Sequence, residues 1–176
     1  MIAIKTKNVS EVADSKFFGE AFLPESWLDG DEFSLTEVFF CQINLEKVAK
    51  YGGQKLLPEK GYLYFFIDFD LKPVKGIVRY ALSPDAYTFF NEDAEVGYDV
   101  EKEVGIDFYA ADDAPAGLLC KHEKLYDNEV CLLKFTPDAF ADMDFLSGTG
   151  GAIMFVIDKD DLENGRFDKA FLINVK

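Results

Sequence analysis

Apolar residues gather in two runs that repeat one another along the chain. The first is Gly61-Tyr-Leu-Tyr-Phe-Phe-Ile-Asp68-Phe-Asp70, and the second is Gly151-Ala-Ile-Met-Phe-Val-Ile-Asp158-Lys-Asp160. In a strand, alternation sends Leu63, Phe65 and Ile67 to one face and Tyr62, Tyr64 and Phe66 to the other. The second copy has Ile153, Phe155 and Ile157 at the positions that correspond to Leu63, Phe65 and Ile67. Because both faces are apolar, each run predicts a central strand covered on both sides.

The two runs predict an internal duplication. Each follows another strand-like run, Phe39–Ile43 in the first copy and Val130–Leu133 in the second, and this alignment matches Cys41 with Cys131. We expect one domain over 1–176, with a first repeat at about 37–71, an insert at 72–127 and a second repeat at about 128–162. Two copies favour a pseudo-symmetric domain over a solenoid, which needs about three repeats or more.

The remaining pattern predicts short helices between strands. Ser10 is expected to cap an opening helix within 8–16, Asn44 a helix over 45–51, and Thr136 a helix that begins at Pro137. A helical turn is expected at 160–164, strands at 77–82 and 170–175, and loops with edge strands over 91–113. The predicted fold class is therefore α+β, predominantly antiparallel β-sheet with short helices.

Composition sets the class of protein. The chain has 176 residues, of which 49% are hydrophobic and 18 are Phe, enough for one domain with a sizeable core. No run approaches the ~20 apolar residues of a membrane span, and the start lacks the apolar segment of a secretory signal. The three cysteines have apolar neighbours. These features predict a reduced, cytoplasmic protein without membrane contact.

The net charge of the chain indicates which classes of partner it can bind. The net charge of −15 comes from 33 acidic and 18 basic residues. Such a field repels nucleic acid and attracts a basic protein partner. Solubility alone is the other explanation of an acidic surface.

Four carboxylates are candidates for a metal site. Asp68 and Asp70, with their copies Asp158 and Asp160, share a face in each strand, and pseudo-symmetry could bring the pairs together around calcium or magnesium. The alternative, which we favour, is that the duplicated Asp residues end the strands and cap the next segment of the chain. No cofactor is expected.

Other residues are candidates for catalysis or binding. Cys120 is the cysteine expected to be exposed, and an i, i+2 spacing would put Cys120 and His122 on one strand face as nucleophile and base. Trp27 is a candidate aromatic anchor for a partner. Gln42 is the candidate ligand contact in a cleft, and Asn44 is a polar residue at the same strand end.

Residues 15–24 read SKFFGEAFLP, and residues 40–45 read FCQINL. These segments resemble the SKFGGxPxLP and AQINL motifs of the YwqG-like family, bacterial proteins that carry a domain of unknown function. Leu57-Pro58 with Gly61–Phe66 resembles LPxxGxLxFF, whereas Phe18, Ala21 and Lys134 depart from the family pattern. The resemblance covers most of 15–176. It implies a compact, mostly β fold with internal pseudo-symmetry and no established activity, and neighbouring toxin genes in some relatives imply an immunity or protein-binding role.

The sequence leads to two hypotheses for function. The first is a non-enzymatic cytosolic binding module, including immunity-type binding of a basic protein. The alternative is a small-molecule- or metal-dependent enzyme that uses the paired Asp residues or Cys120 and His122.

Overall fold

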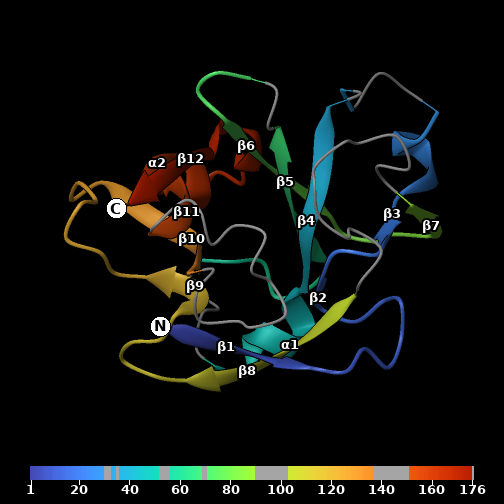
Figure 1. Ribbon diagram of the computed structural model, residues 1–176, viewed down its shortest axis with the longest axis horizontal. Helices are drawn as coiled ribbons and strands as arrows, with labels where there is room; N and C mark the ends of the chain where they lie inside the picture. Colours follow the sequence, from blue (N-terminus) through green and yellow to red (C-terminus); the bar gives the residue numbers. More distant parts are fainter. Residues whose placement is uncertain are drawn as a thin grey trace.

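The computed structural model describes residues 1–29, 33–34, 36–51, 56–68, 71–89, 103–136 and 151–175. Figure 1 shows its strands wrapped around a common interior, with short helices at the periphery. The sheet strands, in chain order, are β1 Ile2–Lys7, β2 Lys16–Phe17, β4 Glu37–Asn44, β5 Tyr62–Asp68, β6 Lys75–Ala81, β8 Val104–Ala110, β9 Ala116–Cys120, β10 Glu129–Phe135, β11 Ala152–Asp158 and β12 Phe171–Val175. A separate pair comprises β3 Glu20–Leu23 and β7 Ala86–Phe89. The helices are α1 Leu45–Ala49 and α2 Lys159–Glu163, with 3-10 turns η1 Glu25–Trp27 and η5 Phe167–Lys169.

The ten sheet strands form one antiparallel, nearly closed barrel. Their order is β12-β11-β10-β9-β1-β8-β2-β4-β5-β6, so β6 and β12 are the two edges. The edges approach each other at Gly76, where an added Cβ would lie 2.6 Å from Leu172 Cβ and 2.8 Å from the Phe155 ring. Side-chain packing therefore brings the ends of the sheet together at this point. The predicted antiparallel sheet with short helices is confirmed.

The two repeated runs are β5 and β11, each between two strands as predicted. The expected inner triplets of both copies belong to the main core, which fills the barrel: Leu63, Phe65, Ile67, Ile153, Phe155 and Ile157. The opposite face of β5 is also covered, since Tyr64 and Phe66 pack in a second cluster with Trp27 and Phe33. The prediction of strands buried on both faces is confirmed.

Each half of the sheet carries the same backbone irregularity. The β4–β5 register shifts between Phe39 and Cys41, and the β10–β11 register shifts between Cys131 and Leu133. Phe18, which follows β2, has a φ of 56°, and Leu119 in β9 has a φ of 52°. This left-handed backbone conformation is uncommon for residues other than glycine.

The helix signals in the sequence are only partly confirmed. Asn44 caps α1 by accepting a 3.1 Å hydrogen bond from Glu46 N–H, as predicted, and α2 is the predicted helical turn. The prediction of an opening helix is wrong. Residues 8–15 contain turns and no helix, and the Ser10 hydroxyl donates to the Asp14 carboxylate. The expectation of edge strands is also wrong for β8, which lies between β1 and β2. The helix expected at Pro137 lies outside the described residues.

Among the described residues, no helix has the length and apolar character needed to cross a membrane.

Candidate functional site

A groove of about 460 Å³ runs along β6, the edge strand of the sheet. Consecutive residues Lys75–Tyr80 form one side, and Trp27, Phe167 and Asp168 contribute from η1 and η5. Trp27 is half-buried and packs edge-on against Tyr64, with ring centroids 5.6 Å apart. Pro24 is the N-cap of η1, with an extended backbone conformation (φ −63°, ψ 128°). The predicted anchor Trp27 thus lines this groove.

Arg79 supplies the groove with a planar cation whose charge is compensated. Its guanidinium donates to both carboxylate oxygens of Glu37, Nη1 to Oε2 at 2.6 Å and Nη2 to Oε1 at 3.1 Å. The same group lies over the rings of Phe33 and Phe66, at 4.5 and 5.0 Å from their centroids. Bidentate pairing and stacking fix its orientation. The groove therefore offers aromatic surface without a strong net charge.

Gln42 and Asn44 are held by contacts within the fold. The Gln42 side chain is fully buried; its oxygen accepts from Phe22 N–H at 2.9 Å, and its nitrogen donates to the carbonyls of Val12 and Asp14 at 2.9 and 2.7 Å. The Asn44 amide nitrogen donates to the Tyr62 hydroxyl at 2.9 Å, while its oxygen caps α1. Both side chains join β4 to its neighbours, so their described contacts are structural. Their predicted role in ligand binding stays a prediction.

The candidate metal ligands end their strands. Asp68 is buried and accepts from Thr36 Oγ1 at 2.9 Å and from Ser34 Oγ at 3.3 Å. Asp158 accepts from the Asn128 amide, and Asp160 lies in the first turn of α2. Within the described part of the chain, no three His, Cys, Asp or Glu side chains gather closely enough to hold a metal ion. Asp70 lies outside the described residues.

Cys120 and His122 do not share a strand face, because β9 ends at Cys120. The expected exposure of Cys120 is wrong: the residue is buried opposite Cys131, and its thiol donates to the Gly117 carbonyl at 3.2 Å. A hydrogen bond between the two thiols lowers the pKa of Cys120 despite burial, and the same bond, together with burial, raises the pKa of Cys131. His122 lies beyond the strand, where its Nδ1 accepts from Lys124 N–H at 3.2 Å.

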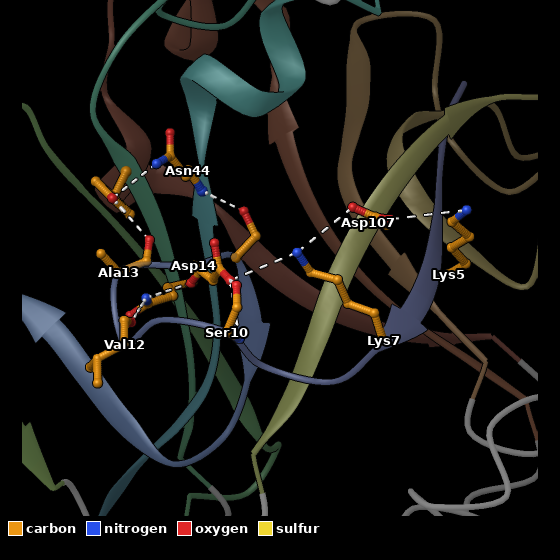
Figure 2. Close-up of polar contacts among 11 residues, drawn as sticks. Lys5, Lys7, Ser10, Val12, Ala13, Asp14, Asn44 and Asp107 are labelled. Atoms are coloured by element: carbon orange, nitrogen blue, oxygen red, sulfur yellow. Dashed lines mark hydrogen bonds and ion pairs between the residues drawn. The ribbon is translucent and has the colours of Figure 1, made fainter.

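A chain of charged groups crosses β1, β8 and the turn before β2, as Figure 2 shows. Lys7 Nζ lies 3.7 Å from Asp14 Oδ2 and 3.8 Å from Asp107 Oδ1, and Lys5 Nζ lies 4.0 Å from Asp107 Oδ2. Burial raises the pKa of Asp14, but the hydrogen bond from the Ser10 hydroxyl and the charge of Lys7 outweigh it and hold that pKa below its ordinary value. Asp14 is therefore ionised at neutral pH. Sequence reasoning missed this cluster, which carries no motif.

Comparison of the chain with models of protein families gives no match, and comparison with curated proteins gives none either.

Proposed function

We propose that the protein is a non-enzymatic cytosolic module that binds a basic protein partner in the groove along β6. The groove itself carries the proposal. Within the described residues, β6 forms strand pairs with β5 alone, and Gly76 packs against Leu172 of β12. Lys75–Tyr80 line the 460 Å³ space together with Trp27 and Phe167. Aromatic side chains supply the strongest anchors in interfaces, so this space can receive side chains of a partner.

Charge supports the choice of a basic partner. The net charge of −15 creates a long-range attraction that raises the association rate of a basic protein. At the groove, Glu37 compensates Arg79, and the formal charges of Lys75 and Asp168 offset each other. The groove therefore adds no strong local repulsion to the attraction of the whole molecule.

The test is affinity capture of partners from the native cell lysate at low and at high salt, with three forms of the chain. The wild type is compared with Trp27→Ala and with Tyr126→Ala, which removes an aromatic ring that is 76% exposed and does not line the groove. We expect a stoichiometric basic protein at low salt, released as salt rises, retained by Tyr126→Ala and lost by folded Trp27→Ala. No specific protein at low salt, or equal capture by all three forms, contradicts the proposal.

We infer, as a finer description of the fold, that the domain arose by internal duplication. The outer strands run β6-β5-β4 from one edge and β12-β11-β10 from the other. Cys41 faces Phe65 directly after its bulge, as Leu133 faces Phe155 after its own. The residues paired with them, Phe17 and Leu118, each precede a left-handed residue.

These pairings support a different alignment from the one that the sequence suggested. They match Cys41 with Leu133, two residues beyond the Cys131 that the sequence alignment chose. Superposition of the two hairpins in a crystal structure tests the inference: the bulges and the left-handed residues should coincide. Bulges at different positions would contradict a common origin.

We propose further that the resemblance to the YwqG-like family reflects common descent. Its quoted segments fall on β2 and β3, on β4 with α1, and on β5. These elements form one half of the sheet and its cover, so the shared residues serve one structural unit. A crystal structure of a family member should have the same strand order; a different order would separate the two.

A further inference from the structure

A second, smaller pocket lies where β1, α1 and β8 meet. Its volume is about 160 Å³, well above the ~10–15 Å³ that a cavity needs to hold one water. The buried side chains of Ile106 and Phe108 line it from β8. Such a space fits a group of a few heavy atoms and is too small for a nucleotide. It lies apart from the groove along β6, because the two share no lining residue.

Three lysines converge on this pocket: Lys7 from β1, and Lys47 and Lys50 from α1 and its end. Lys47 and Lys50 are three residues apart and lie on the same side of the helical turn. Neither forms an ion pair with a carboxylate of the described residues. In a chain with almost twice as many acidic as basic residues, such a cluster of cations is unusual.

Lys7 keeps its hydrogen-bonding capacity for a ligand. Its distances of 3.7 and 3.8 Å from Asp14 and Asp107 exceed the 2.7–2.9 Å typical of a charge-assisted hydrogen bond. Figure 2 shows its ammonium between the two carboxylates. The carboxylates therefore hold Lys7 in place by charge while its N–H groups can donate to a third group.

Ser15 provides a further donor. Its side chain is buried and lines the pocket, and its Oγ accepts a 2.9 Å hydrogen bond from Asn44 N–H. No described residue accepts a hydrogen bond from this hydroxyl, whose O–H therefore remains to donate. Buried polar groups are normally satisfied, so this donor points to an acceptor outside the chain.

The charges around the pocket define the ligand. Lys5 and Lys7 balance Asp14 and Asp107, with which they form ion pairs. Lys47 and Lys50 then remain in excess, a surplus of two positive charges. We propose that this pocket binds a phosphoryl dianion, either as inorganic phosphate or as the phosphate of a small monoester. The oxygens of the dianion accept from the ammonium groups of the three lysines and from Ser15 Oγ–H.

The experiment is calorimetric titration of the full chain at constant ionic strength with inorganic phosphate, with phosphoserine as a monoester, and with chloride. We compare the wild type with Lys47→Gln/Lys50→Gln and with Lys60→Gln/Lys121→Gln, which removes the same charge from exposed lysines outside the pocket. We expect one saturable phosphate site, weakened about tenfold or more in the first variant and about twofold or less in the second. Chloride should not compete at matched ionic strength.

The two sources of the ligand separate in the same titrations. Tighter binding of phosphoserine than of phosphate identifies a monoester site, and the reverse identifies a site for the free ion. Lack of saturation by either below roughly 10 mM overturns the proposal, as does equal weakening in both double variants. Because the exchanged lysines are exposed or at the pocket rim, both variants should retain the wild-type circular dichroism spectrum.

Discussion

The side chain of Gln42 joins separate pieces of the chain. Its amide bonds the turn before β2 and the third residue of β3, Phe22, to β4. We predict that Gln42→Leu lowers the free energy of unfolding by about 3 kcal/mol or more, because three backbone groups lose their partner and each unsatisfied buried group costs ~1–3 kcal/mol. Urea denaturation measures the change.

Gln42→Glu is the matched variant, since it keeps the size and one acceptor. It replaces the donor to two carbonyls with an oxygen, so it should be less stable at pH 7 than at pH 4, where a protonated carboxyl donates again. A loss below about 0.5 kcal/mol in Gln42→Leu would mean that water restores the lost bonds.

The lowered pKa of Asp14 predicts the direction in which the stability of the folded state changes with pH. Its pKa is held below the ordinary value of 3.8, so its ionised form stabilises the folded state. That contribution is fully present above about pH 5 and is lost as pH falls through the folded pKa, below about pH 4. We predict that Asp14→Asn is less stable than the wild type at pH 7 and that the difference narrows towards pH 3.

Ser10→Ala tests the cause of this shift. It removes the hydroxyl donor and should raise the pKa of Asp14, which carboxyl-carbon NMR titration measures directly. An unchanged pKa would assign the shift to Lys7 instead.

At the scale of elements, the pattern of apolar and polar residues along the chain predicted the central strands but not the place of β8 in the sheet. The β5 and β11 runs are apolar on both faces, and that pattern suffices to identify buried central strands. In contrast, β8 alternates buried Ile106 and Phe108 with exposed Asp107, and its acidic neighbours suggested an edge. Its place between β1 and β2 depends on pairing with residues about a hundred positions away, which no local pattern encodes.

The same limit explains which residues of the candidate sites could be predicted from the sequence. Trp27 could be singled out because a large aromatic in a turn is conspicuous, whereas Lys7, Ser15 and Lys50 are ordinary residues that sheet order alone brings together. Ser10 misled the prediction because a serine that can cap a helix can also bond a nearby carboxylate, here Asp14, in a turn.

The closure of the sheet depends on one small residue. A Cβ at Gly76 would lie 2.6 Å from Leu172 Cβ, which real contacts do not tolerate. We predict that Gly76→Ala costs about 1–3 kcal/mol by overpacking the junction of β6 and β12. The measurement is the urea midpoint, with hydrogen exchange on β6 and β12 to locate the opening.

Leu172→Gly supplies the second half of a double-mutant cycle. The double variant should lose less stability than the sum of the single variants, because the variant lacks the Leu172 Cβ that the new methyl group would meet. Additive losses would mean that β6 and β12 do not pack against each other in solution.

For the whole molecule, the sum of charges matters more than any exposed pair. Pairs such as Lys5–Asp107 contribute ~0–1 kcal/mol each, and salt weakens them. The excess of carboxylates repels itself in the compact state, and salt screens that repulsion as the Debye length falls from about 10 Å at 0.1 M to about 3 Å at 1 M. The Lys16–Glu103 pair, at 2.7 Å with Lys16 fully buried, is screened much less.

We therefore predict that sodium chloride stabilises the protein, with a urea midpoint that rises between about 0.01 and 0.5 M salt because repulsion is screened. Phosphate at the same ionic strength should raise the midpoint further, since a ligand that binds only the folded state stabilises it by mass action. Lys47→Gln/Lys50→Gln should keep the chloride effect and lose the extra phosphate effect. A midpoint that falls with chloride would mean that attractive pairs outweigh the net charge. An extra phosphate effect that persists in the variant would trace that effect to general salt exclusion from the surface.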